Sequence, residues 1–434
     1  MTQKPRFHPA DPLSVGATLF GRLNAKMFEA PTLATNDSFL RATLLPLAQQ
    51  SPGGMPEGDI RIVRRDRHIS MMTFALFCDG ALVQKLSLNH EGTVRHLWRE
   101  GDAWVTNSRG VFSHHGLYDD LDPAAAAAAT LPNVFAFVRP RVADSLLQAA
   151  ALASAHHRAG RTSVPVYTPP TRTIFDPFWA HEQLGVTTER VARTDRCHVV
   201  MGRAGLANHG QINRALRTIF GRRDRARALS FAPKTRGPLY VSFDVEKMRW
   251  LNAVDVIDAF LQTLAENDER VSAVIVNGMT APFDGAPPDF FDEVRAQEAV
   301  LIADLARRQP ALSIMHLFGQ TMRQKVEAVR AASFFITPAG SADYLPGGLK
   351  IPGVIVGNPI RLAMPREISN RNAVDVPHDL IAMEERPTGA MLHAWTERDN
   401  WKDYAIDPAP FARFAFNHYR THVMMPAAAQ DTTP

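Results

Sequence analysis

The second half of the chain alternates short apolar runs with stretches of helical periodicity. The apolar runs predict strands at 238–243, 271–276, 312–315, 334–336 and 354–356. Between them, apolar residues recur every three or four positions, which predicts helices at 252–264, 291–307 and 322–331. Strands that alternate with helices are typical of a parallel, doubly wound sheet. We therefore expect one Rossmann-like domain here, followed by an amphipathic helix at 410–422.

The first half reads differently. Residues 58–115 favour a β meander, and Asp79-Gly80 is a hairpin turn signal between two of its strands. The strands predicted in this segment cover 60–63, 71–77, 81–86, 103–106 and 111–113. From about residue 130 the pattern becomes α/β. Strands are predicted at 133–138, 164–167 and 197–201, and helices at 142–157 and 178–184, with Gly185 as a C-cap. Residues 1–57 carry scattered Pro, Gly and Ser and are predicted to be irregular.

These patterns indicate an α/β fold with two Rossmann-like domains and a β-rich N-terminal addition. Residues 228–237 lack periodicity and are the predicted linker. The predicted domains are 1–230, including the β-rich segment, and 238–405, with a C-terminal helix and tail at 406–434. The length of the chain agrees with this division, since 434 residues suffice for two or three domains.

Composition narrows the class of protein. Hydrophobic residues make up 45% and charged residues 21%, which favours a folded chain over a disordered one. No apolar run approaches the ~20 residues that span a bilayer, and the N-terminus shows no apolar signal segment. Two cysteines cannot form a disulfide framework. We therefore expect a cytoplasmic protein.

The formal charge of +4 is a mild excess, partly concentrated at 222–227. A nucleic-acid binder is one interpretation of this charge, but no basic segment with interleaved aromatic residues supports it. A solvated helix face is the simpler interpretation. We therefore expect no nucleic-acid partner.

Polar and small residues follow the predicted strands of the second half. Open parallel sheets bind ligands at the carboxyl ends of their strands, so these positions are the candidate ligand-binding residues. The loop at 337–342 is the most informative, because Gly340 would let the backbone approach a phosphate and Ser341 would cap the following helix. A plain strand-to-helix turn explains the same loop without a ligand. The candidates are Ser242, Lys247, Arg249, Asn277, His316, Thr337, Gly340 and Ser341.

Several catalytic classes are disfavoured because their motifs are missing. The sequence holds no GxxxxGK[ST] loop, no GxGxxG after a strand, no HExxH and no GxSxG. His114-His115 is followed by Asp119-Asp120, but adjacent histidines on an extended chain point to opposite faces, which disfavours a metal site. A catalytic base is more plausible in this loop. The candidates are His115, Asp119 and Asp120, and no metal or cofactor is expected.

Three stretches carry a resemblance to a known family. They are the helix at 176–186 that ends in Leu184-Gly185, the strand 240–243 followed by Arg249 and Asn252, and the loop 335–342. In this order and spacing the chain resembles a GT-B glycosyltransferase of the family 61 type, with bacterial polysaccharide enzymes among the relatives. Two histidines that are typical of the family are replaced here, by Ala136 and Ala339.

The resemblance implies an inverting, metal-independent glycosyltransferase that uses a nucleotide-sugar donor and a glycan or polysaccharide acceptor. Lys247, Arg249, Gly340 and Ser341 would hold the donor diphosphate, and Asn277 and His316 its base or ribose. A related GT-B transferase, such as a polysaccharide pyruvyltransferase or a Kdo transferase, would keep the fold but change the donor. The two missing histidines motivate a further alternative, a non-catalytic carbohydrate-binding or assembly protein. The oligomeric state stays open, as does peripheral membrane association through the C-terminal helix or the β-rich addition.

Overall fold

The structure is a computed structural model of the whole chain. It divides into two compact units, one made of residues 1–173 and 177–215 and the other of residues 174–176 and 216–434. The described residues are 6–8, 11, 13–16, 18–19, 22–23, 32–34, 38–64, 71–89, 92–107, 130–136, 163–167, 176–190, 198–200, 209–221, 235–243, 245, 249–281, 291–364, 366, 368, 370–384 and 402–425. None of the described helices is long and apolar enough to cross a membrane.

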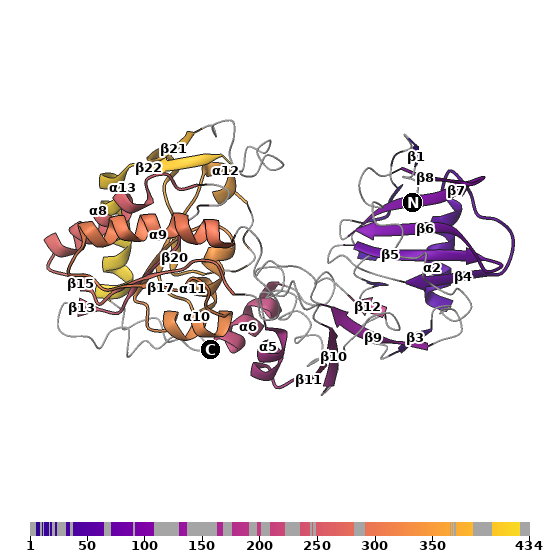
Figure 1. Cartoon of the computed structure of the whole chain (residues 1–434), viewed down its shortest axis with the longest axis horizontal. Helices are drawn as coiled ribbons and strands as arrows, with labels where there is room; N and C mark the ends of the chain where they lie inside the picture. The colour runs from indigo at the N-terminus through magenta and orange to yellow at the C-terminus, as the bar shows by residue number, and fades with distance from the viewer. Residues whose placement is uncertain are drawn as a thin grey trace. The chain divides into compact units, whose positions relative to one another are not determined.

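The β-rich part of the first unit is a sheet in the order β1-β8-β7-β6-β5-β4, with β2 paired to β7 (Figure 1). Its strands are β1 (Arg6–Phe7), β2 (Leu13–Ser14), β4 (Ile60–Arg64), β5 (Met71–Cys78), β6 (Ala81–Asn89), β7 (Thr93–Glu100) and β8 (Ala103–Thr106). The predicted meander is confirmed over β4, β5, β6 and β8, whereas its last predicted strand, 111–113, lies outside the described residues. Asp79 and Gly80 both have positive φ (50° and 82°), as a type I′ hairpin turn requires.

Four elements of this region were not predicted: the two short strands β1 and β2, the longer strand β7, and helix α2 (Ser38–Gln49). β7 was missed because Arg95, His96 and Arg99 interrupt its apolar pattern, although the strand is central in the sheet. Helix α2 lies in the segment that was predicted to be irregular, and it buries Leu40, Leu44 and other apolar residues at helical spacing. The prediction of irregular structure is therefore wrong for α2, and also for the two-residue strands β1 and β2.

The first unit also contains a parallel sheet in the order β11-β10-β9-β12, with β3 (Thr32–Ala34) antiparallel to β9. Its strands are β9 (Thr130–Ala136), β10 (Ser163–Tyr167), β11 (Thr187–Arg190) and β12 (His198–Val200). In chain order this is 3-2-1-4, the first part of a Rossmann-type sheet. Helix α5 (Pro177–Gln183) precedes β11, and Gly185 after it has φ 71°, as predicted for its C-cap.

The second unit is built on a fully parallel sheet in the order β17-β16-β14-β18-β19-β20. Its strands are β14 (Leu239–Val241), β16 (Val274–Val276), β17 (Ile314–His316), β18 (Phe334–Pro338), β19 (Gly353–Val356) and β20 (Ala373–Asp375). In chain order this is 3-2-1-4-5-6, the strand order of the Rossmann sheet. A short pair, β13 (Thr235–Arg236) and β15 (Arg270–Val271), lies outside this order. The predicted α/β fold with two Rossmann-like sheets and a β-rich addition is confirmed.

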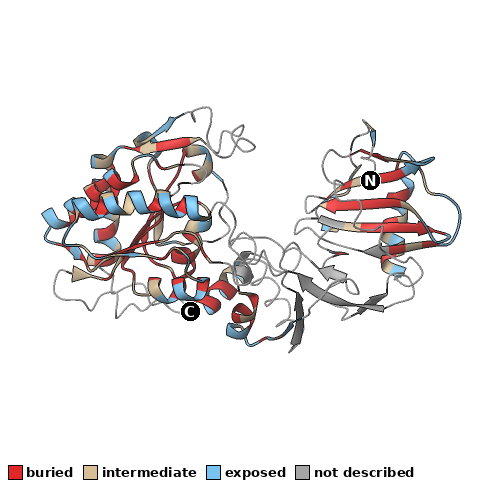
Figure 2. Cartoon of the chain, in the orientation of Figure 1, coloured by how far each residue is buried: buried red, intermediate tan, exposed pale blue. Residues whose placement is uncertain are grey.

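Helices cover both faces of this sheet, and its four central strands, β16, β14, β18 and β19, are buried (Figure 2). On one face, Phe334 stacks on Phe260 of α8 (Ala253–Glu266) and meets Tyr419 of α13 (Pro408–Tyr419). His316, which the strand register places on that same face, contacts α9 (Phe291–Arg308). The other face carries the short α11 (Tyr344–Gly348), which contacts α10 (Met322–Val329).

The C-terminal segment belongs to this same unit. β21 (Ile381–Glu384) pairs with β22 (Asp403–Ile406), and α13 packs against α8 before a π-helical turn at Arg420–Met424. The boundary between the units falls within α6 (His209–Phe220). The end of this helix packs in the second unit, where Phe220 contacts Gly348 and its carbonyl accepts hydrogen bonds from Arg330.

Candidate functional site

The strand order of the second sheet reverses between β14 and β18. At this topological switch point the loops at the carboxyl ends of the two strands diverge to opposite faces, which leaves room for a ligand. Ser242 follows β14, and its backbone N–H donates to the carbonyl of Ile336 on β18. Gly340 and Ser341 follow β18. The structure therefore brings together the loop that the sequence marked as most informative and a second candidate strand end, that of β14.

A polar network extends from Ser242 across the neighbouring strand end. The Asn277 Nδ2 donates to Ser242 Oγ at 3.3 Å, and Lys325 Nζ donates to Asn277 Oδ1 at 3.0 Å and to the Gly278 carbonyl. Lys325 comes from α10 and is 1% exposed. Burial lowers its pKa to about 7, although the nearby Glu298 opposes this shift. Because an ammonium only donates, Lys325 fixes which end of the Asn277 amide faces Ser242.

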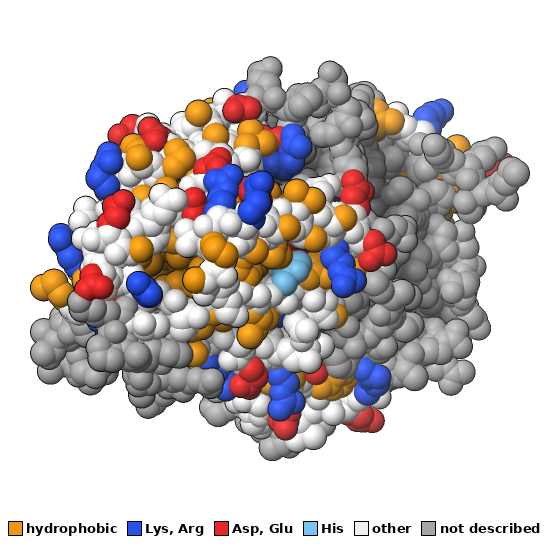
Figure 3. All heavy atoms as spheres, turned by 60° about the vertical axis from the view of Figure 1, so that its left-hand side comes forward, with side chains coloured by type: hydrophobic (Ala, Val, Ile, Leu, Met, Phe, Trp, Pro, Cys, Tyr) orange, Lys and Arg blue, Asp and Glu red, His pale blue; other side chains and the backbone are white. Residues whose placement is uncertain are grey.

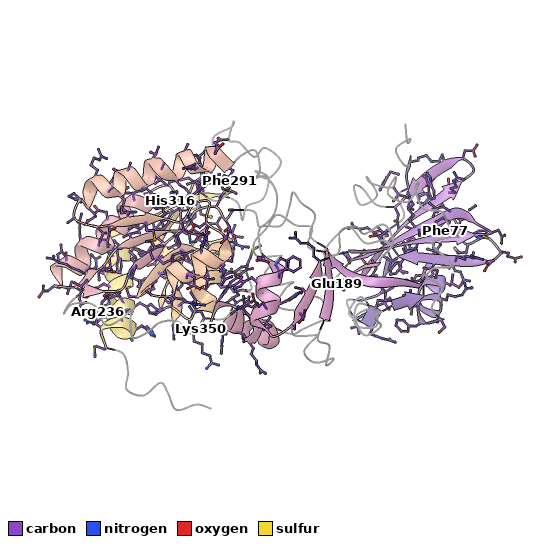
Figure 4. The ribbon with its side chains drawn as sticks, turned by 60° about the horizontal axis from the view of Figure 1, so that its bottom comes forward. Phe77, Glu189, Arg236, Phe291, His316 and Lys350 are labelled. Carbon is purple, nitrogen blue, oxygen red and sulfur yellow. The ribbon has the colours of Figure 1, made fainter. Side chains whose placement is uncertain are left out.

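His316 extends the network along the same edge. Its Nε2 lies 2.9 Å from Oε2 of Glu298, a residue of α9 that is buried. Gly278 has φ 117°, and a Cβ there would lie 2.9 Å from both of these side-chain atoms. His316 also neighbours an aromatic pair, Phe291 and Phe318, whose ring centroids are 4.3 Å apart (Figure 4). The predicted residues Asn277 and His316 thus lie at the same carboxyl edge of the second sheet. Hydrophobic side chains also gather at the surface of this unit (Figure 3).

A basic side chain lies against the glycine loop. The guanidinium of Arg361, from the short helix α12 (Pro359–Leu362), comes so close to Gly340 that a Cβ there would be 3.1 Å from its Nη2. Its Nε donates to the carbonyl of Ala339 at 3.3 Å, and its backbone N–H donates to Asn358 Oδ1. Gly340 has φ 139°, which L side chains rarely adopt. The backbone conformation therefore favours glycine here, and a guanidinium group lies beside the loop.

Arg249 is engaged in a contact that the sequence did not predict. Its Nε and Nη2 lie 2.8 and 2.7 Å from Oδ2 of Asp403, and its backbone N–H donates to Oδ1 at 2.9 Å. Asp403 is buried and belongs to β22. Asn252, the other residue of that motif, exchanges two hydrogen bonds with the backbone of Ile406. Both residues therefore anchor the C-terminal hairpin to the sheet.

The remaining predicted residues differ in accessibility. Thr337 is fully buried within β18, and its hydroxyl has no hydrogen-bond partner among the described residues. Ser341 is exposed at the start of a 3₁₀ turn (Ser341–Asp343). Lys247, His115, Asp119 and Asp120 lie outside the described residues, so their roles stay predictions. Within the described part of the chain, no group of three or more His, Cys, Asp or Glu side chains could hold a metal ion.

A cavity of about 270 Å³ lies on the face of the sheet that carries α11, and Gly347 of that helix lines it. Phe335, Ile355 and Ile368 supply apolar walls, and Asp343 and Arg366 supply charge. Burial raises the pKa of the Asp343 carboxyl to about 7, against the opposing effects of Arg366 and of a backbone hydrogen bond from Gly340. Arg366 forms an ion pair with Asp375. The cavity therefore combines apolar walls with one carboxyl group and one guanidinium group.

Sequence reasoning missed Arg361, Lys325, Glu298 and Asp343. A signal for Arg361 exists, because Asn358-Pro359 is a helix start that directly follows the fifth strand, and only the ends of the first four strands were interpreted. Asp343 lies one residue beyond the predicted loop at 337–342. Lys325 and Glu298 have no such signal, since a charged residue within a helix is usually solvated.

Comparisons with known proteins give weak likenesses only. No protein-family model matches the sequence, and no curated protein resembles it. The ADP-heptose LPS heptosyltransferase II of E. coli is 11% identical, over 67% of this chain and 99% of that chain, with a TM-score of 0.38. The dodecameric iron-containing heptosyltransferase TibC of enterotoxigenic E. coli, solved with ADP-D-β-D-heptose, is 11% identical, over 74% and 84%, with a TM-score of 0.36. The Gap123 complex of Streptococcus agalactiae is 9% identical, over 93% and 83%, with a TM-score of 0.26.

Such low scores assign the chain to no family and to no activity, and the resemblance to family 61 is not confirmed. The class that the structure itself defines is an α/β protein whose second unit carries a Rossmann-type sheet with a polar carboxyl edge.

Proposed function

We propose that the second unit binds the nucleotide diphosphate of a sugar donor at the switch point between β14 and β18, and that the chain is a glycosyltransferase. The observation that carries this proposal is the glycine loop at the switch point, with the Arg361 guanidinium against Gly340. The backbone of Gly340 and the guanidinium would face the phosphates, as small loops and arginines do at other phosphate sites. The resemblance described from the sequence supplies the reaction class.

The proposed chemistry needs stabilisation of the leaving diphosphate. As the bond between the sugar carbon and the phosphate oxygen breaks, negative charge grows on the diphosphate. The Arg361 guanidinium is held by the Ala339 carbonyl and its backbone N–H by the Asn358 side chain, so it would stabilise this charge with little reorganisation. A fixed guanidinium at this position supports the metal-independent mechanism that the resemblance implies. Lys247 stays a second candidate for the same role.

The other edge of the site would hold the nucleoside. Lys325 orients Asn277 so that its amide donates to Ser242 Oγ, and the Ser242 hydroxyl proton is then directed elsewhere. Such a hydroxyl would donate to a phosphate or ribose oxygen. The catalytic base that would take the proton of the acceptor hydroxyl stays a sequence prediction, with His115, Asp119 and Asp120 as candidates. Inversion at the sugar carbon stays a proposal as well.

The test is donor turnover. The full chain is incubated with nucleotide sugars carrying UDP, GDP, CMP, ADP or dTDP, with a mixed glycan acceptor and without it, and nucleotide release is measured. We expect release with one nucleotide class, at least 100-fold slower in Arg361→Gln, since one fixed charge donor contributes about 10²–10³ in rate. Arg323→Gln, an exposed arginine on α10, is the control. Glycan binding without any release would favour the non-catalytic alternative, and equal release by Arg361→Gln would refute the assigned role.

A further inference from the structure

Two histidine rings lie against each other at the end of α13. His418 belongs to the last turn of that helix, and His422 lies four residues later in the π-helical turn that follows. Their ring centroids are 4.4 Å apart, with an angle of 50° between the ring planes. Residues four apart share one side of a helix, and two histidines at this spacing bind one zinc ion in the HExxH motif. We call His418 and His422 the histidine pair.

A backbone carbonyl fixes the tautomer of His418. Its Nε2 lies 2.9 Å from the carbonyl oxygen of Asn372, directly before β20. Because a carbonyl only accepts, Nε2 carries the proton, and Nδ1 of the neutral ring keeps a lone pair. Histidines that bind metals typically donate their other N–H to a carbonyl or a carboxylate, which orients the ring. His418 therefore has the outer hydrogen bond that is typical of a metal ligand.

The histidine pair is uncharged and accessible. Burial lowers the pKa of both imidazoles below the ordinary value of 6.5, although the hydrogen bond to Asn372 opposes this shift in His418. Above about pH 7 both rings are therefore neutral, which is the form that binds a metal. Among the described residues, no hydrogen bond reaches Nδ1 of His418 or either nitrogen of His422. Both side chains are partly exposed, so water can reach them.

The backbone at the histidine pair is unusual. Met425 N–H donates to the carbonyl of Arg420, five residues earlier, which closes a π-helical turn. Such turns are rare, and they occur frequently at functional sites. The turn contains His422, so it determines where this ring lies relative to His418. The π-helical turn is thus a second feature, independent of the ring contact, that points to a function here.

We propose that the histidine pair binds a divalent transition-metal ion, with Zn²⁺ as the representative ion. Imidazole nitrogens suit zinc, copper and nickel, whereas magnesium and calcium prefer oxygen ligands. Zinc–nitrogen bonds of about 2.0–2.1 Å place two nitrogens of a tetrahedral site about 3.3 Å apart, and rings with centroids 4.4 Å apart can reach that separation. Water would fill the other coordination positions.

The proposed metal site is distinct from the proposed donor site. The His418 ring lies 6.0 Å from the ring of Phe334, between centroids, and Phe334 begins β18. Gly340 follows the other end of that strand. The metal would therefore lie at the amino edge of the sheet, where it would fasten the end of α13 and stabilise the second unit.

The first test is thermal unfolding of the full chain with ZnCl₂, with MgCl₂ as the control salt. We expect Zn²⁺ to raise the Tm by several degrees at about a hundred times its Kd, and Mg²⁺ to have no such effect. Loss of an outer hydrogen bond alone weakens metal binding by about 10–100-fold, so His418→Gln and His422→Gln should each weaken zinc binding at least 10-fold. His422→Gln is the cleaner variant, because it leaves the bond to Asn372 in place. His378→Gln removes an exposed histidine of the same unit and should keep the full response.

A spectroscopic measurement counts the nitrogen ligands. With one equivalent of Cu²⁺, nitrogen hyperfine splitting in the electron paramagnetic resonance spectrum should show two imidazole nitrogens in the wild type and one in His422→Gln. Two nitrogens in His422→Gln would overturn the proposal. A zinc response that His422→Gln retains in full, or that His378→Gln loses as well, overturns it too, as does a wild type that does not respond to zinc.

Discussion

Arg249 gives the sharpest contrast between the sequence and the structure. The sequence predicts that its guanidinium neutralises a diphosphate, whereas in the structure this group binds Asp403 through two nitrogens at 2.7 and 2.8 Å. The Asp403 side chain is 2% exposed and that of Arg249 is 39% exposed. We predict that Arg249→Met mainly destabilises the second unit and leaves nucleotide binding intact wherever the unit stays folded.

The expected loss of stability in Arg249→Met depends on the Asp403 carboxylate, which stays buried without its guanidinium partner. Removing one partner of a buried ion pair costs about 3–5 kcal/mol, because the remaining charge stays desolvated. This pair is partly accessible to water at Arg249, and Asp403 would still accept a hydrogen bond from the backbone N–H of residue 249. We therefore expect a smaller loss of stability, about 2–3 kcal/mol. In a unit of this size that loss lowers Tm by ~4–12 °C. Adding Asp403→Leu to the same chain should recover most of it, since no buried charge then remains.

Hydrogen exchange provides the local assay. Tyr404 N–H donates to the Arg249 carbonyl and Leu251 N–H donates to the Tyr404 carbonyl, so loss of the ion pair should speed exchange in 402–407 first. Arg307→Met, which breaks an exposed pair with Asp304, is the control and should change stability by less than about 0.5 kcal/mol. The reasoning is refuted if Arg249→Met loses nucleotide binding at unchanged stability, because the guanidinium would then be a ligand of the diphosphate.

Three further predictions concern packing and charge in the second unit. Gly353→Ala should destabilise it by at least ~3 kcal/mol in urea unfolding, because the new Cβ would lie 2.3 Å from the Phe335 carbonyl oxygen; a loss under about 1 kcal/mol would contradict the packing described here. Gly278→Ala should weaken nucleotide binding at least 10-fold, measured by calorimetry, since its methyl would separate His316 from its carboxylate partner; unchanged affinity would remove this edge from the site. The folded pKa of Asp343, about 7, lies above its ordinary value of 3.8, so stability should fall as pH rises from about 4 to 7; Asp343→Asn should flatten that slope, and an unchanged slope would exclude this group as its source.

The fold could be predicted largely from local periodicity. The strands of the second sheet follow short apolar runs such as Val274–Val276, and helices such as α8 show clear three- and four-residue spacing. β20 was missed, because Ala373–Asp375 is short and only half-buried at the edge of the sheet. No local sequence pattern determines the order of the strands in the sheet, so that order is known only from the structure.

The candidate site could be predicted in part. Chain order alone places Ser242, Asn277 and Gly340 at strand ends, and parallel strands bring those ends to one edge. Partners that come from distant segments were not predictable. Asp403 is 154 residues from Arg249, and no local pattern marks it as the residue that binds the guanidinium. Arg361 could have been predicted as a candidate site residue, since it follows a predicted strand and the start of a helix.

The central claim is that a nucleotide diphosphate binds at the carboxyl edge of the second sheet. The most direct measurement is a thermal-shift panel of the full chain with UDP, GDP, CMP, ADP and dTDP, each with and without magnesium. We predict a shift of several degrees with one nucleotide at about a hundred times its Kd, independent of magnesium and lost in Arg361→Gln. No shift with any nucleotide, or a shift that Arg361→Gln retains in full, would contradict the claim.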